Sequence, residues 1–112
     1  MGKKIGMSEI ILVRVNCPDK DVAQRLAGSA ISDRLAACAN IQGPLISIYE
    51  WEGETERAEE WVVWFKTTKS CWPALEADIV DGHPYEVPAI LSIPCENAHQ
   101  PFAEWIAGQT EA

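Results

Sequence analysis

The sequence predicts an α+β domain in which strands and helices follow the order β-α-β-β-α-β. Two observations favour this order. Apolar residues recur at helical spacing within 22–35, and this segment follows a β-type run at 10–15. Two further β-type runs, 45–52 and 61–68, precede a second helical segment and a last strand at 89–93. With 112 residues, 47% of them hydrophobic, the chain fits one domain with a real core.

The first helix is the best-defined element. The strand at 10–15 ends in the sequence Asn-Cys-Pro-Asp, and Asp19 is suited to cap the helix that follows. Charged and polar residues occupy mostly the opposite side from the apolar ones, so the helix is expected to bury one stripe. The residues of that stripe are Val22, Ala23, Leu26, Ala27, Ala30, Ile31 and Leu35.

The next two strands are expected to form a β-hairpin. Gly43-Pro44 breaks the chain before the strand at 45–52, and the charged stretch 53–60 is predicted to be a solvated reversal before the strand at 61–68. A metal-binding acidic loop is the alternative for 53–60. It is disfavoured because the oxygen-bearing residues do not alternate around a central glycine as in a calcium loop.

Ser70 is predicted to cap the second helix, with Pro73 tolerated in its first turn. Gly82 stands where a residue of left-handed conformation commonly ends a helix. The last strand, 89–93, opens after a proline, and a short terminal helix is expected around 102–107.

This order is the split βαβ arrangement of ferredoxin-like domains, an antiparallel sheet with helices on one face. Residues 61–65 are apolar at every position, so both faces of that strand are expected to be buried. The simplest cover for the second face is another copy of the chain. The predicted organisation is a single domain at 9–108, with a loose N-terminal tail at 1–8 and a C-terminal tail at 109–112.

Charge and cysteine spacing exclude several classes of protein. A formal net charge of −8 argues against binding to nucleic acid or to an anionic membrane surface. The apolar runs are far shorter than the ~18 residues of a spanning helix, and no signal-peptide pattern is present, which predicts a cytoplasmic protein. The four cysteines, Cys17, Cys38, Cys71 and Cys95, lack the clustered spacing of a zinc site and are expected to be free thiols.

Seven stretches together carry a resemblance to a known family: NCPDKDVAQRLA (16–27), RLAACANI (34–41), SIYEWEGE (47–54), KTT (66–68), PALE (73–76), HPYEVPAI (83–90) and FAEWI (102–106). They resemble the CutA family, the divalent-cation tolerance proteins. The resemblance runs from about Ile10 to Ile106. It implies a ferredoxin-like fold, a tight homotrimer in which the long β-hairpin exchanges sheet contacts between subunits, and an architecture similar to PII signalling proteins. It also implies a role in tolerance of copper and other divalent cations.

Cys17 and His83 are the candidate metal ligands. Cys17 matches the strand-end cysteine that some family members pair with histidine in a proposed copper site, and a neutral imidazole at His83 suits copper or zinc. Those members can carry a second histidine directly before this one, where the present chain has Gly82, so one expected ligand is missing. The structural alternative is that His83 lies past a helix end and complements its last carbonyls.

Trp51, Lys66, Tyr85 and Glu86 are the candidate residues of a cleft between subunits. Tyr85 and Glu86 could serve a hydrolase as acid and base. The structural alternative is that Tyr85 packs at a subunit junction while Glu86 pairs with a cation such as Lys66. An aromatic residue on a hairpin, such as Trp51, is more typical of an oligomer seam than of a ligand cage. No nucleophile elbow, metalloprotease motif or phosphate loop is present, so the chain is predicted not to be an enzyme.

Three functions remain open from the sequence. The first is a homotrimer that responds to metal ions by binding copper or another divalent metal weakly, with no other cofactor. The second is a PII-like signalling trimer that binds a small metabolite at clefts between subunits. The third is a structural trimer that presents partner proteins.

Overall fold

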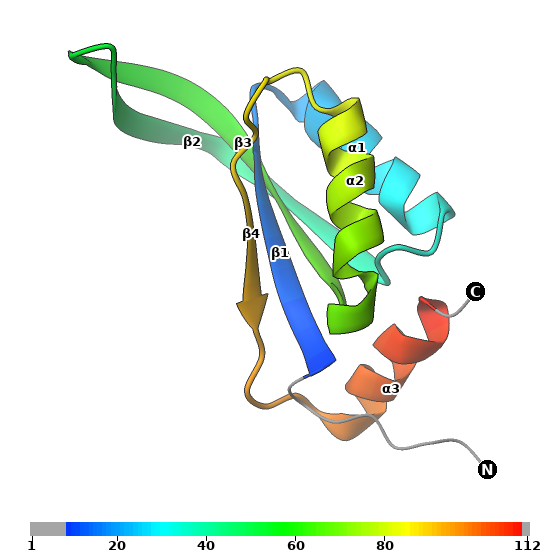
Figure 1. Ribbon diagram of the computed structural model, residues 1–112. Helices are drawn as coiled ribbons and strands as arrows, with labels where there is room; N and C mark the ends of the chain where they lie inside the picture. The colour runs from blue at the N-terminus through cyan, green and yellow to red at the C-terminus, as the bar shows by residue number, and fades with distance from the viewer. Residues whose placement is uncertain (1–8, 111–112) are drawn as a thin grey trace.

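The computed structural model describes residues 9–110 of the chain. Its elements confirm the predicted order with a C-terminal helix (Figure 1). They are β1 (Ile10–Cys17), α1 (Lys20–Ser32), β2 (Cys38–Trp51), β3 (Glu54–Thr68), the 3-10 turn η2 (Lys69–Cys71), α2 (Trp72–Gly82), β4 (Ile90–Pro94) and α3 (Gln100–Gln109). The predicted tail at 1–8 and residues 111–112 lie outside the described residues. The helix α3 continues past 108, and Thr110 is its C-cap.

One antiparallel sheet, with strands in the order β2-β3-β1-β4, carries α1 and α2 on the same side. Val13 of β1 lies opposite Phe65 of β3, and Leu12 lies opposite Ile93 of β4. Alternate residues of the two central strands point to the helices and build the core. The main core residues are Ile11, Val13, Val15, Cys17, Leu26, Val63, Phe65, Leu75 and Ile79. The fold is therefore the predicted ferredoxin-like α+β sandwich.

The helix α3 lies at the end of the sheet remote from the hairpin tip (Figure 1). Its residues Ala103 and Ile106 are fully buried and pack with Ile10 in a second, smaller core. This contact holds the start of β1, at the end of the strand opposite Cys17. Between residues 9 and 110, no helix is long and apolar enough to cross a membrane.

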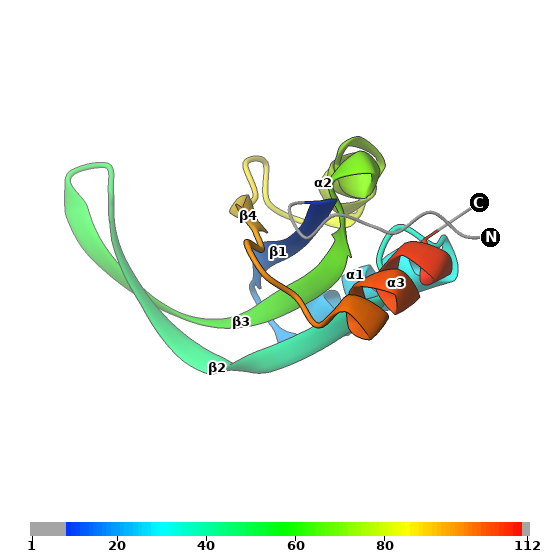
Figure 2. The same cartoon turned by 90° about the horizontal axis from the view of Figure 1, so that it is seen from below.

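The strands β2 and β3 extend beyond the body as a long curved hairpin (Figures 1 and 2). As a result the molecule measures 56 × 26 × 22 Å. Val62 and Val63 point to opposite faces of the sheet, yet both are fully buried within one chain. The apolar run at 61–65 therefore does not by itself require a second copy. Exposed apolar side chains lie instead on the hairpin and on the edge strand β4: Ile46, Ile48, Tyr49, Trp51, Leu91 and Ile93.

The predicted reversal at 53–60 is wrong. The turn consists of Glu52 and Gly53, both with positive φ (50° and 80°), as in the tight two-residue turns that suit the twist of a hairpin. The strand β3 already begins at Glu54. The predicted break at Gly43-Pro44 is also wrong: β2 begins at Cys38 and passes through this dipeptide, with a register shift before Leu45.

Two predictions at the ends of α2 are wrong as well. The helix begins at Trp72 without a side-chain cap, while Ser70 lies in the preceding 3-10 turn. Gly82 is the last residue of α2 and does not have a positive φ. It is small for another reason, since a Cβ built there would lie 3.0 Å from Cδ2 of Leu26 on α1. The predicted cap of α1 is confirmed, because the Asp19 carboxylate accepts a hydrogen bond of 2.8 Å from the Val22 amide.

Candidate functional site

The end of β1 and the loop after α2 meet at His83. Its Nε2 lies 2.7 Å from the carbonyl oxygen of Asn16, and its Nδ1 accepts a hydrogen bond of 3.1 Å from the amide of Tyr85. A carbonyl only accepts, so Nε2 carries the ring proton and donates it. Both ring nitrogens are therefore engaged, and the side chain is 8% exposed. This is a structural role, but it differs from the predicted alternative, because His83 contacts a carbonyl of β1 rather than the last carbonyls of α2.

Cys17, the last residue of β1, is fully buried against α1 and β3. Burial raises the pKa of its thiol to about 11, and the negative charges of Glu60 and Asp19 add to this effect. The Arg25 guanidinium opposes it. Since the thiolate is the form that binds metal ions, the Cys17 thiol must lose its proton against this environment before it can be a ligand.

The structure thus brings the elements of the two predicted metal ligands together within one chain. It does not present them as free ligands, because Cys17 is a protonated, buried thiol and both nitrogens of His83 make hydrogen bonds. Within the described part of the chain, no group of three or more His, Cys, Asp or Glu side chains is arranged to hold a metal ion. A metal site at Cys17 and His83 therefore stays a prediction. To bind a metal ion, His83 would have to break one of its two hydrogen bonds.

Glu60 is a central residue of the site that the sequence did not predict. Its side chain is 9% exposed and lies on β3 between β1 and the loop after α2. One carboxylate oxygen accepts a hydrogen bond of 3.2 Å from the Asn16 amide, and the other accepts one of 3.2 Å from the Tyr85 hydroxyl. Arg14 donates to the side-chain oxygen of Asn16 at 2.7 Å. These four side chains form one polar chain that runs from the sheet to the loop.

Tyr85 is the outer end of this polar chain. Burial raises the pKa of its phenol to about 12, and the charge and hydrogen bond of Glu60 contribute to the rise. Its ring packs on the His83 ring, with 4.8 Å between the centroids. Tyr85 is therefore a hydrogen-bond donor at neutral pH and is unsuited to act as a base.

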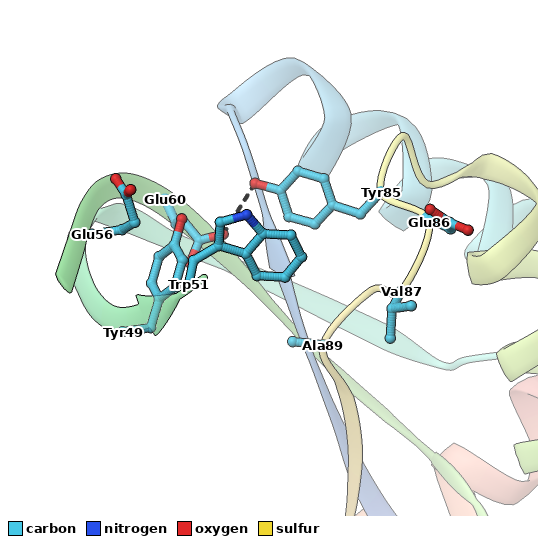
Figure 3. Close-up of a pocket in the computed structure, with 8 residues that line it drawn as sticks. All are labelled: Tyr49, Trp51, Glu56, Glu60, Tyr85, Glu86, Val87 and Ala89. Atoms are coloured by element: carbon cyan, nitrogen blue, oxygen red, sulfur yellow. Dashed lines mark hydrogen bonds between the residues drawn. The ribbon is translucent and has the colours of Figure 1, made fainter. Parts of the chain in front are cut away.

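A cavity of about 650 Å³ opens between the hairpin and the loop after α2 (Figure 3). In the ladder, Tyr49 lies opposite Glu56, so both side chains are on the same face of the hairpin. Glu60 and Trp51 share that face by strand alternation, whereas Glu59 lies on the other. The lining residues are Tyr49, Trp51, Glu56, Glu60, Tyr85, Glu86, Val87 and Ala89.

Three of the four residues predicted for a cleft, Trp51, Tyr85 and Glu86, line this cavity of a single chain. Lys66 does not: its ammonium group contacts the side-chain oxygen of Asn40 and the Cys38 sulfur. It follows Glu60 along β3 by six residues, a separation of about 20 Å at ~3.3 Å per residue. Glu86 therefore has no pairing with Lys66 within the chain, and the cleft between subunits stays a prediction. All four cysteines are free thiols.

Comparison with known proteins gives a consistent result. The family model described as CutA1 divalent ion tolerance protein matches residues 11–109. Protein CutA of Mus musculus is 38% identical over 98 residues, which is 88% of this chain and 55% of the mouse protein. The chain thus spans about half the length of this mammalian relative.

Solved structures agree with the sequence comparison. The divalent ion tolerance protein CutA1 from Ehrlichia chaffeensis is 32% identical, with a TM-score of 0.90, and the match covers 96% of this chain and all of that chain. The periplasmic divalent cation tolerance protein CutA from Archaeoglobus fulgidus is 30% identical, with a TM-score of 0.88, and the match covers 91% of this chain and 99% of that one. With its fold, its hairpin and nearly its whole length matched, the chain belongs to the CutA1 divalent ion tolerance protein family.

Proposed function

We propose that this protein contributes to tolerance of divalent metal ions by binding copper or another metal weakly at Cys17 and His83, and that it acts by binding rather than by catalysis. The observation that carries the proposal is the hydrogen bond between His83 and the Asn16 carbonyl, which joins the elements of a sulfur donor and a nitrogen donor. Soft sulfur ligands favour Cu(I), so we expect copper to bind in this oxidation state.

The surroundings of the two donors explain why binding is expected to be weak. The ion must displace a proton from a thiol whose pKa is raised to about 11, and His83 must give up one hydrogen bond. In return, a cation gains from the negative charge of Glu60, which is close enough to raise the pKa of both Cys17 and Tyr85. Because ligand thiols lose protons on binding, the apparent affinity is expected to fall as the solution is acidified.

The test is a Cu(I) titration of the untagged protein against a competing chelator. We expect Cys17→Ser to remove most of the binding and His83→Ala to remove a smaller share, with the fold retained in each case. Cys95→Ser is the matched control, since Cys95 is partly buried beside Ile10 at the opposite end of β1. Equal binding by the parent and both site variants would contradict the proposal.

We further propose that the working form is a homotrimer in the cytoplasm. The support is the projecting hairpin, whose exposed Ile46 and Ile48 are on the face opposite the cavity, together with exposed Leu91 on the edge strand β4. Apolar side chains beside an unpaired strand edge favour sheet contacts with a further copy. Light scattering at micromolar concentration is expected to give three times the chain mass, and Ile48→Glu is expected to lower it. A stable monomer of the parent protein would contradict this assembly. Cell fractionation tests the proposed location and is expected to recover the protein in the cytoplasmic fraction.

A second candidate function is favoured by one observation, the cavity of about 650 Å³ between the hairpin and the loop after α2. Pockets of this size, with apolar walls and a few polar groups, are typical of small-molecule sites. A PII-like role, in which each subunit binds a small metabolite and the trimer passes on the signal, fits such a cavity. Retention of a metabolite by the purified, metal-free protein would support this role over metal binding. Purification of the protein free of any bound small molecule, together with no response to added metabolites, would contradict it.

A further inference from the structure

We propose that the cavity between the hairpin and the 85–89 loop binds a small organic cation that carries a methylated ammonium group. This inference rests on the second candidate function and names the chemical class of its ligand. It is carried by three features of the same cavity: the charge of its walls, a buried carboxylate without a counter-charge, and a set of aromatic rings.

All the charged side chains in the walls are acidic. Glu56, Glu60 and Glu86 line the cavity, and none of the lining residues is Lys, Arg or His. Glu56 and Glu60 come from the hairpin, whereas Glu86 lies on the far side, beyond Tyr85 (Figure 3). An anionic metabolite such as a nucleotide would meet only repulsion here, so charge complementarity selects a cation.

Glu60 supplies the strongest reason for a cationic ligand. Its carboxylate is nearly buried and accepts hydrogen bonds only from two neutral groups, the Asn16 amide and the Tyr85 hydroxyl. Arg14 binds Asn16 rather than Glu60, and no ion pair joins Glu60 to any residue within 9–110. A buried carboxylate without a counter-ion is costly, so a cation beside Tyr85 would remove an existing energetic cost.

The aromatic rings indicate that the cation is organic. Tyr49, Trp51 and Tyr85 line the cavity together, and Trp51 is 62% exposed although its indole is large and apolar. Ammonium groups bind favourably over aromatic faces, best over tryptophan, and methylated ones lose little hydration when they do so.

A divalent metal ion fits the same walls poorly. Calcium takes six to eight oxygen ligands at about 2.3–2.6 Å, and magnesium requires octahedral oxygen geometry. The described residues contain no group of three or more His, Cys, Asp or Glu side chains that could hold a metal ion. Val87, which is 86% exposed, and Ala89 add apolar wall that would contact methyl groups but would leave a hydrated metal ion without partners.

The test compares choline with 3,3-dimethyl-1-butanol, which has the same shape without the charge. Calorimetric titration of the metal-free, 112-residue chain is expected to show saturable binding of choline and at least about tenfold weaker binding of the neutral analogue. In proton–nitrogen NMR spectra, we expect choline to shift the indole signal of Trp51, assigned with a Trp51→Phe variant.

The variants test charge and position separately. Glu60→Gln keeps the size of the side chain and is expected to weaken choline binding at least about tenfold. Glu59→Gln is the matched control, because Glu59 is next to Glu60 in sequence but is exposed on the opposite face of the hairpin. This variant is expected to leave binding unchanged. If Glu60→Gln does not fold, Glu56→Gln tests the charge at an exposed position, with an expected loss of several fold.

Three outcomes would overturn the inference. Equal binding of choline and its neutral analogue would mean that the cavity is a small-molecule site without cation selection. Unchanged choline affinity in Glu60→Gln would place any binding elsewhere. If the parent protein does not bind choline, the inference is wrong. Loss of assembly in Glu60→Gln would then mean that a side chain of a neighbouring copy fills the cavity. None of these outcomes bears on Cu(I) binding at Cys17 and His83, which is measured independently.

Discussion

Replacing Gly82 by alanine tests why the end of α2 requires glycine. A Cβ at this position would lie 3.0 Å from Cδ2 of Leu26 and 3.3 Å from Nη1 of Arg25. Leu26 is 2% exposed, so its side chain cannot move into solvent. Overpacking of this kind costs about 1–3 kcal/mol, while alanine gains up to about 1 kcal/mol over glycine in a helix. We therefore expect Gly82→Ala to lower the free energy of unfolding by about 1 kcal/mol per chain.

Gly28→Ala in α1 is the matched control. A Cβ there meets no atom within 4 Å, so the same substitution is expected to raise stability by about 0.5–1 kcal/mol. Urea unfolding at a fixed chain concentration measures both variants, and the slope of free energy against urea should not change. The contrast in sign separates packing from helix propensity.

A double-mutant cycle distinguishes packing from backbone strain. Leu26→Val removes the atom that the new Cβ would meet, so Gly82→Ala should cost less, or become stabilising, when combined with Leu26→Val. An equal cost of Gly82→Ala with and without Leu26→Val would refute the packing explanation and would favour strain at Gly82 itself.

Three further predictions concern single side chains. Ellman's reagent at pH 8 should leave Cys17 unmodified in the native protein and modify it after unfolding, because the thiol is fully buried with its pKa raised to about 11; rapid native labelling that Cys17→Ser abolishes would contradict this. In a Tyr49→Phe variant, absorbance at 295 nm should show Tyr85 ionising near pH 12, and adding Glu60→Gln should lower this pKa. Because the folded-state pKa is raised, the stability contributed by the neutral phenol is full below about pH 10 and is lost as the pH rises through 12. Ionisation of Tyr85 near pH 10 would contradict its contact with Glu60. Glu52→Asn should stabilise the chain by about 0.5–1 kcal/mol in urea unfolding, because asparagine tolerates the φ of 50° better, and a loss of stability would mean that the Glu52 side chain makes an important contact.

Local patterns predicted the parts of the fold that depend on a core. The helix α1 was identified because its apolar stripe packs on the sheet, and Asp19 caps it as expected. The hairpin was misjudged for the opposite reason. Residues 54–59 project beyond the body, so most of their side chains are exposed and charged, as in a loop, although the backbone is paired along the whole ladder.

The candidate site could be predicted only in part, because its key contacts join distant segments. Tyr85 and Glu86 can be identified as candidates because they stand in the unusual stretch His-Pro-Tyr-Glu-Val-Pro (83–88). Glu60, in contrast, is one of several carboxylates in a charged stretch and is expected to be a surface residue. Its role depends on the register of β1 with β3, which places Glu60 beside the end of β1, where it contacts Asn16 and Tyr85, whereas Glu59 faces away. Gly82 shows the same limit. A glycine is needed there because Leu26, 56 residues earlier in the chain, leaves no room for a Cβ.

X-ray absorption at the copper edge, on protein loaded with one Cu(I) per chain, tests the proposed metal function most directly. The proposal predicts sulfur and imidazole nitrogen as the nearest ligands, with the sulfur contribution lost in Cys17→Ser and the imidazole contribution lost in His83→Ala. A spectrum that neither substitution alters, or one that contains only oxygen ligands, would contradict the assignment of copper to these two side chains.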